Sequence, residues 1–399
     1  MPDTLVTMDR TALLSVARDW SHWDAPPTAS VPRAVDLPVE LRPNLALVVQ
    51  GVRRCGKSTL LSQLMSHYAL DRQRCLFVNF EDPRLAQHLD HTVLQALVDA
   101  FEAERGPNCT FFFDEIQAVA SWQKWLRSQL DRSRGRRFVV TGSNSGLLAG
   151  EAGSTLTGRH LRVELFPFDL AEYRLLKPRA KLLQYLAAGG FPEPAKSRDG
   201  DRLLRTYFDD IVERDIRERV AARSSQRLRQ LLQMTFESAG SELSVRRVAA
   251  ATGLAPDTAA SYLEAAESAY LVFGCPWFAY SARRTAVRNK KYYPVDTGLR
   301  RAVITPTGED RGKQLECATF MLLRQRFRDV CYWRDQGEVD FVVLKGRTPV
   351  PVQVAWDGPA ERHQRALDAF YEAHPHAGEA VFVTADSFAE GVPELRPES

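Results

Sequence analysis

The strongest constraint on what this chain can fold into is the segment from Gly51 to Ser58, which reads Gly-Val-Arg-Arg-Cys-Gly-Lys-Ser. It fits the pattern G-x-x-x-x-G-K-[ST], which is typical of a phosphate-binding loop. The apolar run Leu45–Val49 precedes it and a helical pattern over 59–68 follows, so the loop is expected between a buried strand and a helix. There, consecutive backbone N–H groups can converge on a phosphate, and the helix dipole favours its negative charge.

The residues of this loop are therefore expected to bind ATP and Mg²⁺. The Lys57 ammonium is expected between the β- and γ-phosphates, and the Ser58 hydroxyl is expected to reach the metal. The complete set predicted to contact the nucleotide is Gly51, Val52, Arg53, Arg54, Cys55, Gly56, Lys57, Ser58 and Thr59.

Two adjacent acids, Asp114 and Glu115, directly follow the apolar strand Phe111–Phe113. Because parallel strands end at the same edge of a sheet, Asp114 is expected beside Mg²⁺. Glu115 is then positioned to polarise the attacking water as general base. The competing interpretation, two acids that cap the next helix, is disfavoured because the pair closes a strand.

Two polar segments further along the chain supply additional candidates. Thr141 and Ser143 end a predicted strand over 138–141 and are expected to sense the γ-phosphate, although a tight polar turn also explains them. Arg159 is a candidate arginine finger, since charge develops on the transferred phosphoryl group. A structural salt bridge explains Arg159 equally well.

Composition limits the class of protein in several ways. The net charge of +3 does not by itself indicate a nucleic-acid partner, and the basic cluster around 283–291 is either a solvated loop or a phosphate-binding patch. The six scattered cysteines form no C-x-x-C pair, which argues against a zinc site and suits a reducing cytosol. No apolar run reaches the ~18 residues of a membrane span. We therefore expect a cytoplasmic protein without a membrane partner.

Strands alternate with helices from 45 to 141, which predicts an α/β fold with a parallel sheet. Beyond about 165 the pattern is mostly helical. Residues 243–278 read as a helix-turn-helix with a trailing strand pair, and an α-β-β-β-α-β order follows from about 308.

With these motifs in place, the chain resembles a large bacterial and archaeal family of AAA-type ATPases with a C-terminal domain of unknown function. The matching pieces, in chain order, are Gly51-Val-Arg-Arg-Cys-Gly-Lys-Ser-Thr59, Phe113-Asp-Glu-Ile-Gln117, Thr141-Gly-Ser143, Leu156-Thr-Gly-Arg159, Phe166-Pro-Phe-Asp-Leu-Ala-Glu172, Gly189-Gly-Phe-Pro-Glu193, Arg214-Asp-Ile216, Lys291-Tyr-Tyr-Pro-Val-Asp296 and Gly337-Glu-Val-Asp-Phe341. The resemblance implies an ATPase core, a helical lid, a winged helix and a restriction-endonuclease-like end domain, assembled as a homo-oligomer.

The predicted division follows from these modules. It is an N-terminal helix and linker (1–43), the P-loop ATPase core (44–165), the lid (166–235), the winged helix (236–300) and the end domain (301–399). In a winged helix that reads DNA, the second helix usually carries basic or amide side chains. Here that helix, Pro256–Ala266, contains acids and no basic residue, so packing or protein contact is the favoured role.

The resemblance of the end domain to metal-dependent nucleases implies a site with a helix Glu, a strand Asp and an acid-x-Lys pair on the next strand. Glu316 and Asp340 match the first two positions, and Gln353 stands at the third, whereas Ala355 replaces the lysine. This pattern favours a degenerate site.

Three functions remain open at this point. The leading one is an ATPase switch or motor that acts on DNA or a DNA-bound partner. The alternatives are an ATP-regulated nuclease in genome defence or repair, and an ATP-controlled signalling or assembly protein that binds no nucleic acid.

Overall fold

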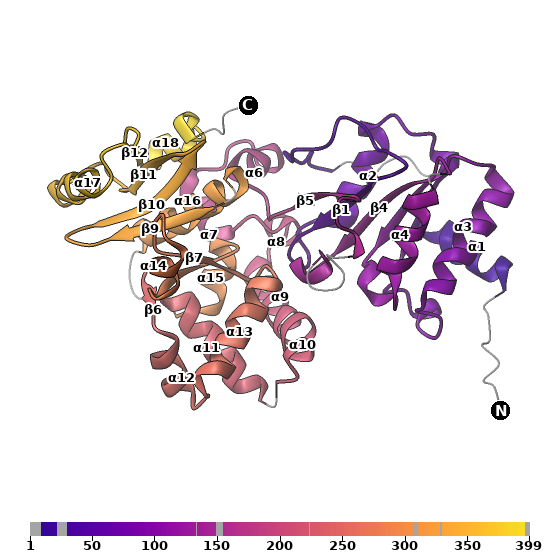
Figure 1. Cartoon of the computed structure of the whole chain (residues 1–399), viewed down its shortest axis with the longest axis horizontal. Helices are drawn as coiled ribbons and strands as arrows, with labels where there is room; N and C mark the ends of the chain where they lie inside the picture. Colours follow the sequence, from indigo (N-terminus) through magenta and orange to yellow (C-terminus); the bar gives the residue numbers. More distant parts are fainter. Residues whose placement is uncertain are drawn as a thin grey trace. The chain divides into compact units, whose positions relative to one another are not determined.

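The structure, a computed structural model, describes residues 9–21, 30–132, 134–148, 155–222, 224–305, 310–327 and 329–395. The chain divides into two compact units. The first comprises Met1–Val52 and Gly56–Leu165, and the second comprises Arg53–Cys55 and Phe166–Ser399 (Figure 1).

A five-stranded sheet in the order β2-β3-β4-β1-β5 forms the centre of the first unit, and all of its strands are parallel. β4 therefore lies between β1 and β3. The strands are β1 (Ala46–Gln50), β2 (Cys75–Asn79), β3 (Thr110–Asp114), β4 (Arg137–Gly142) and β5 (His160–Glu164). Every residue of β1 and of β3 is buried, as expected of parallel strands covered on both faces. The predicted α/β class is confirmed.

Helices cover this sheet (Figure 1). They are α1 (Arg10–Ser21), α2 (Lys57–His67), α3 (His91–Arg105) and α4 (Trp122–Arg132), with short 3₁₀ turns at Arg72–Arg74, Pro83–Leu85, Ile116–Ala118 and Ser145–Leu148. α1 packs against β2 and α3. On α4 the side chains of Trp122 and Trp125 are buried in the core: the Trp125 ring lies 5.6 Å from the ring of Phe138, edge to face.

β5 was not anticipated from the sequence. Its residues His160–Glu164 alternate charged and apolar side chains, and only Val163 of the five is fully buried. Such a strand at the edge of a sheet lacks the apolar run by which the inner strands are recognised.

The second unit begins with short helices. These are α6 (Leu170–Leu176), α7 (Leu182–Ala188), α8 (Pro192–Lys196), α9 (Gly200–Asp210), the π-helical segment η5 (Ile211–Arg217), α10 (Glu218–Val220) and α11 (Ser225–Glu237). The hydrophobic side chains of α9 and η5 that are buried include Leu204, Phe208 and Ile216. This region is helical, as the sequence predicted.

A small antiparallel sheet with the order β6-β8-β7 follows. In chain order the elements are β6 (Glu242–Leu243), α12 (Val245–Thr252), α13 (Pro256–Ser268), β7 (Val272–Cys275), α14 (Ala282–Ala286), β8 (Lys290–Pro294) and α15 (Thr297–Val303). The helix pair and β7 lie where the sequence predicted them, whereas the second strand of the pair, β8, lies beyond the predicted range of 243–278 and follows α14.

The last part of the second unit contains a four-stranded sheet in the order β12-β11-β10-β9. Its elements are α16 (Arg311–Arg326), β9 (Val330–Arg334), β10 (Glu338–Lys345), β11 (Thr348–Val354), α17 (Glu361–Ala373), β12 (Val381–Val383), α18 (Ala385–Ala389) and a 3₁₀ turn at Pro393–Leu395. The amide of Phe278 donates to the carbonyl of Tyr332 at 2.7 Å, which joins this part to the chain that follows β7. Within the described ranges, no helix combines the length and apolar character that a membrane span requires.

Candidate functional site

The predicted phosphate-binding loop connects β1, which ends at Gln50, to α2, which begins at Lys57. Two loop residues have left-handed backbone conformations: Gly56 with φ 102° and Arg54 with φ 70°. Glycine adopts this region without a steric penalty, so Gly56 allows the tight entry into the helix. No side chain caps the N-terminus of α2. The N–H groups of its first turn are therefore available to an anion.

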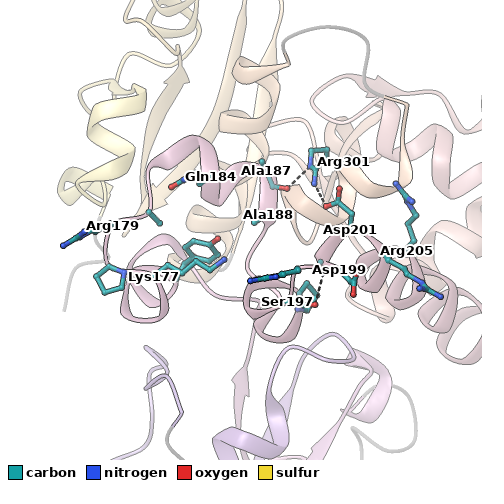
Figure 2. Close-up of a pocket in the computed structure, with 17 residues that line it drawn as sticks. Lys177, Arg179, Gln184, Ala187, Ala188, Ser197, Asp199, Asp201, Arg205 and Arg301 are labelled. Atoms are coloured by element: carbon teal, nitrogen blue, oxygen red, sulfur yellow. Dashed lines mark hydrogen bonds and ion pairs between the residues drawn. The ribbon is translucent and has the colours of Figure 1, made fainter.

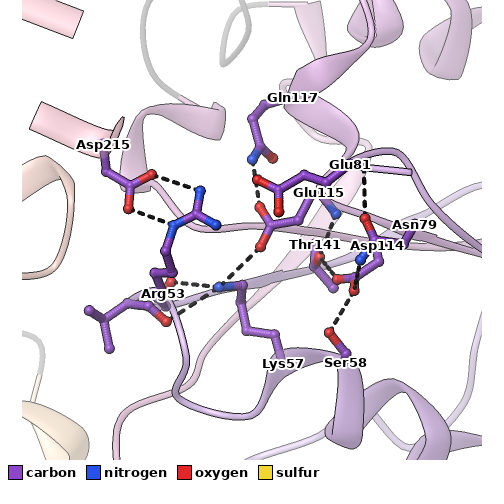
Figure 3. Close-up of polar contacts among 12 residues, drawn as sticks. Arg53, Lys57, Ser58, Asn79, Glu81, Asp114, Glu115, Gln117, Thr141 and Asp215 are labelled. Atoms are coloured by element: carbon purple, nitrogen blue, oxygen red, sulfur yellow. Dashed lines mark hydrogen bonds and ion pairs between the residues drawn. The ribbon is translucent and has the colours of Figure 1, made fainter. Parts of the chain in front are cut away.

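The side chain of Lys57 is buried and folds back over the loop (Figure 3). Its Nζ donates to the carbonyls of Gly51 at 3.1 Å and Val52 at 3.3 Å. It also forms an ion pair with Glu115, with 3.6 Å between Nζ and Oε1. The ammonium is thus held beside the loop amides by its own backbone.

Asp114 accepts several hydrogen bonds at this edge of the sheet. Its carboxylate accepts hydrogen bonds from Ser58 Oγ at 2.6 Å, from Asn79 Nδ2 at 3.3 Å and from Thr141 Oγ1 (Figure 3). Asp114 is almost fully buried. Burial, followed by the neighbouring Glu115 carboxylate, raises the pKa of Asp114, whereas the hydrogen bonds from Ser58 and Thr141 favour its charged form.

Glu115 has φ 52°, an uncommon conformation for a residue with a Cβ atom. Its amide donates to Thr141 Oγ1 at 3.0 Å, and its carboxylate accepts from Gln117 Nε2 at 2.6 Å as well as pairing with Lys57. Strained backbone of this kind persists where the surroundings hold it, and it clusters at functional sites. Thr141 therefore positions both acids, since it donates to Asp114 and accepts from Glu115.

The other predicted residues have different surroundings. Ser143 is buried on the segment after β4. Arg159 pairs with Asp131 of α4, with 3.0 Å between Nη2 and Oδ1, which is the salt bridge that the sequence left open as an alternative. Both side chains of that pair are partly exposed.

Arg53, Arg54 and Cys55 are counted with the second unit. The Arg53 guanidinium pairs with Asp215 of η5 in a bidentate contact, with 3.1 Å between Nε and Oδ2 (Figure 3). The Arg54 guanidinium lies 5.6 Å from the centre of the Tyr207 ring. Cys55 is completely buried.

The sequence did not single out Asn79 or Gln117. Asn79 ends β2, so a polar residue at the carboxyl end of a buried strand was the available signal. Gln117 lies two residues after Glu115, in the 3₁₀ turn that begins at Ile116, and its contact depends on how that turn folds.

The donor set of this edge fits a hard divalent cation. The Ser58 hydroxyl and the Asp114 carboxylate are oxygen ligands, and their separation of 2.6 Å allows both to reach one ion. Mg²⁺ prefers such ligands, completed by water and substrate phosphates. These two residues would hold the metal.

A second polar cluster lies in the last part of the chain, around the predicted nuclease residues. Lys291 of β8 is almost fully buried, and its Nζ pairs with Glu338 and lies 3.7 Å from Glu316 Oε1. Tyr293 donates to the same Glu316 oxygen at 2.7 Å. Lys291 thus supplies an ammonium to the acids of α16 and β10, although it is distant from them in sequence. The basic cluster around 283–291 is consequently not one surface patch.

Asp340 and Gln353 complete this cluster. Burial and then Glu316 raise the pKa of Asp340 to about 7, and Asp340 Oδ2 accepts from the Val354 amide at 2.7 Å. Gln353 donates to the carbonyl of Glu338 at 2.8 Å and accepts from the Asp340 amide at 3.4 Å. Both ends of the Gln353 side chain are therefore engaged with backbone. In the part of the chain that the structure describes, no group of three or more His, Cys, Asp or Glu side chains is arranged to hold a metal.

Comparison with known families agrees with the fold and the loop. Residues 43–174 match the family model of an AAA domain, and residues 179–310 match that of a domain of unknown function (DUF8612). The chain is an AAA-type P-loop protein in which a domain of unknown function follows the AAA domain. The resemblance inferred from the motifs is confirmed.

Similar chains occur in bacteria and archaea. An uncharacterized protein of Haemophilus influenzae is 29% identical over 340 residues, which are 79% of this chain and 84% of the relative. An uncharacterized protein of Methanocaldococcus jannaschii is 29% identical over 366 residues, which are 85% of this chain and 80% of the relative. Among solved structures, Cdc6p from Pyrobaculum aerophilum is 15% identical, covers 68% of this chain and 88% of its own, and has a TM-score of 0.26. A TM-score this low supports no argument about function.

Proposed function

We propose that the protein is a Mg²⁺-dependent ATPase that works as a molecular switch or motor. One observation carries the proposal: Lys57 of the loop and Glu115 after β3 face each other across 3.6 Å at the same edge of the sheet. A phosphate-binding cation and a general base must lie on either side of a γ-phosphate for hydrolysis.

Different residues of the site would bind the phosphates, hold the metal and accept the proton. Amides of the first turn of α2 and the Lys57 ammonium bind the phosphates, while Ser58 and Asp114 hold the metal. When bound, Mg²⁺ neutralises charge on the β- and γ-phosphate oxygens. Glu115 accepts a proton from the attacking water, and Gln117 orients its carboxylate through their 2.6 Å hydrogen bond.

The Lys57–Glu115 ion pair gives the site a means of responding to its substrate. A triphosphate carries more negative charge than one carboxylate, so it attracts the Lys57 ammonium more strongly. Glu115 then loses its cationic partner and becomes free to accept a proton. Binding of the triphosphate would therefore allow Glu115 to act as the general base.

The experiment that tests this function is the substitution Glu115→Gln. The variant should bind a fluorescent ATP analogue with an affinity within about threefold of wild type, because the loop and Lys57 are unchanged. Its turnover should fall by about 10²–10⁴-fold, the usual contribution of a general base. The matched control is Glu104→Gln, a surface acid that pairs with Arg18. Hydrolysis at the wild-type rate by Glu115→Gln would remove the base assignment.

We propose that the ATPase acts on DNA or on a DNA-bound partner through the winged helix and the end domain. The helix pair α12–α13 and the β6-β8-β7 sheet have the order of elements that a winged helix needs. The ATPase rate with and without a panel of DNA and RNA structures tests this point. Stimulation by DNA supports it, and a rate unchanged by every nucleic acid favours the signalling alternative.

We also propose homo-oligomeric assembly, with Arg159 reaching the γ-phosphate of a neighbouring copy. The partly exposed Arg159–Asp131 pair supports it, because an exposed pair of this kind costs only about 0–1 kcal/mol to exchange. Turnover per protomer should then rise with protein concentration, and Arg159→Ala should remove that rise. A flat dependence in wild type would exclude action in trans.

A second candidate, metal-dependent nuclease activity, is favoured by Lys291. The ammonium that Ala355 cannot supply lies beside Glu316 from another strand. Labelled DNA should be incubated with Mg²⁺ or Mn²⁺, with Asp340→Ala as the comparison. Cleavage that Asp340→Ala abolishes supports a nuclease, and intact DNA under every condition excludes it.

A further inference from the structure

An open pocket with a volume of about 1050 Å³ lies among the helices α6 to α9 and α15 of the second unit (Figure 2). Its lining is strongly basic, with six cationic side chains against two carboxylates. The local excess of four positive charges exceeds the +3 of the whole chain. The cationic side chains are Lys177, Arg179, Arg198, Arg202, Arg205 and Arg301.

Only part of this charge is neutralised within the protein. The Arg301 guanidinium pairs with Asp201 and also donates to the carbonyl of Ala187 at 2.8 Å (Figure 2). Arg205 donates to the backbone carbonyl of Ala302 at 3.2 Å, which leaves its charge uncompensated. Of the two carboxylates, Asp199 therefore remains as the one acid facing the other cations.

The remaining cations come from separate segments around the pocket. Lys177 follows α6 and lies 5.7 Å from the centre of the Tyr173 ring, while Arg179 is on the next loop. Arg198 precedes α9, and Arg202 is in its first turn. For the described residues, no ion pair joins Arg179, Arg198 or Arg202 to a carboxylate. These side chains are exposed, so their charges face solvent or a ligand.

The N-terminus of α9 adds to the positive potential of the pocket. This helix of 11 residues begins at Gly200, and the side chain of Asp199 does not cap it. Gly200 and Asp201 line the pocket, so the uncapped end of the helix lies at its wall. The partial positive charge of a helix N-terminus favours anions.

The pocket offers little to a nucleobase. Its one aromatic side chain, Tyr173, is almost fully buried and carries the Lys177 ammonium near its ring. Proteins that read single-stranded bases stack them on exposed aromatic faces, which are absent from the described lining. The chemistry of the pocket therefore suits phosphate groups and not bases.

We propose that this pocket binds the phosphate backbone of a nucleic-acid strand without reading its base sequence. Its volume of about 1050 Å³ lies just above the roughly 300–1,000 Å³ of small-molecule sites, which suits several linked phosphates better than one small ion. The inference rests on the proposed action on DNA and names the surface that contacts it. It also explains how the protein can bind DNA although α13 carries acids and no basic side chain.

The test is binding of fluorescein-labelled 20-nucleotide strands, followed by anisotropy without ATP at several salt concentrations. Arg198→Ala/Arg202→Ala should weaken binding at least tenfold. It should also lower the magnitude of the slope of log K against log[salt] by about 1.4, the value for two lost phosphate contacts on a single strand. The matched control is Arg132→Ala/Arg134→Ala, which removes two exposed arginines from the first unit and should change the affinity less than twofold.

Several outcomes would overturn the proposal. These are equal losses in the test and control variants, no binding by wild type at 50 mM salt, or affinities for oligo-dT and oligo-dA that differ more than tenfold. Binding of inorganic tripolyphosphate, measured by calorimetry, together with no binding of DNA would assign the pocket to free polyphosphate instead. Circular dichroism of both variants should be unchanged, because the substituted side chains are exposed.

This proposal and the ATPase proposal can fail separately. Arg198→Ala/Arg202→Ala should keep the ATPase rate measured without DNA, and Glu115→Gln should keep the affinity for the labelled strand. DNA binding that depends on the pocket, together with wild-type turnover by Glu115→Gln, would retain this inference and remove the base assignment. Loss of turnover in Glu115→Gln, together with unchanged DNA affinity in Arg198→Ala/Arg202→Ala, would remove only the proposal for the pocket.

Discussion

The hydroxyl of Ser58, in the first turn of α2, donates a 2.6 Å hydrogen bond to the carboxylate of Asp114 at the end of β3, 56 positions later. The contact joins the predicted phosphate-binding loop to Asp114, the predicted metal ligand, at one edge of the sheet. The predictions for this edge concern the groups that hold it together.

Lys57→Ala should abolish nucleotide binding. The substitution removes the charge that lies 3.1 Å from the Gly51 carbonyl and would meet the β- and γ-phosphates. Titration with a fluorescent ATP analogue should show at least a hundredfold loss of affinity. Lys124→Ala, which removes an exposed lysine from α4 of the same unit, is the control and should bind as wild type does. Undiminished affinity in Lys57→Ala would contradict the site.

Thr141→Val should lower turnover about tenfold or more and destabilise the first unit by about 1–3 kcal/mol, the cost of unsatisfied buried groups. The hydroxyl is completely buried, donates to Asp114 Oδ1 and accepts from the Glu115 amide, so valine removes the hydrogen bond that each of these two groups makes with it. Steady-state ATPase rates and urea unfolding measure the two effects. Thr141→Ser retains the hydroxyl and should recover most of both, whereas an equally inactive serine variant would argue that volume matters instead.

Lys291→Met should destabilise the protein by about 3 kcal/mol, because it leaves the Glu316 and Glu338 carboxylates without their buried cation. Chemical denaturation measures the change. The neighbouring Lys290→Met is a close control, since that side chain is 47% exposed and its pair with Glu267 spans 3.8 Å. Adding Glu338→Gln to Lys291→Met should restore part of the loss. An additive further loss would show that Lys291 does not act through Glu338.

Asp82 makes the stability of the first unit depend on pH. Its carboxylate accepts from the Arg84 side chain and from Trp20 Nε1 at 2.8 Å. The Arg84 hydrogen bond, as the largest cause, lowers the pKa of Asp82 to about 2. A pKa below the ordinary value means that the folded state prefers the charged form. This stabilisation is complete above about pH 4 and is lost as the pH falls towards 2.

Asp82→Asn should therefore cost about 1–2 kcal/mol at pH 7, as expected for hydrogen bonds to a charged group. The difference from wild type should shrink mainly between pH 4 and pH 2, measured by urea unfolding at each pH. Asp71→Asn is the control, because Asp71 also precedes a 3₁₀ turn but its side chain is 62% exposed. A difference that stays constant down to pH 2 would contradict the role of the Asp82 charge.

The sequence was informative where short motifs meet regular elements. The loop ending at Ser58 and the acids at 114 and 115 each follow an apolar strand, so the common edge of a parallel sheet was enough to bring them together. Thr141 was found by the same rule. Its hydrogen bonds to both acids depend on the register between β3 and β4, which no local pattern encodes.

Long-range partners and weakly patterned segments were not predictable. β5 has only one buried residue, Val163, and lacks an apolar run, so it resembles a loop in sequence. Lys291 was noted only as part of a basic cluster, because its approach to Glu316 depends on how β8 folds near α16. The pocket of the second unit is formed by residues from 173 to 301, and no single stretch of sequence reveals its excess of charge.

The place of β4 between β1 and β3 sets the width of the nucleotide site. Neighbouring strands are about 4.8 Å apart, so the strand that leads into the loop and the strand that ends in Asp114 are separated by roughly 10 Å. Were β1 and β3 adjacent, half that span would remain, too little for a phosphoryl group, its metal and a water in line. The inserted strand thus acts as a spacer, and a sheet without it would lack the gap in which hydrolysis is proposed to occur.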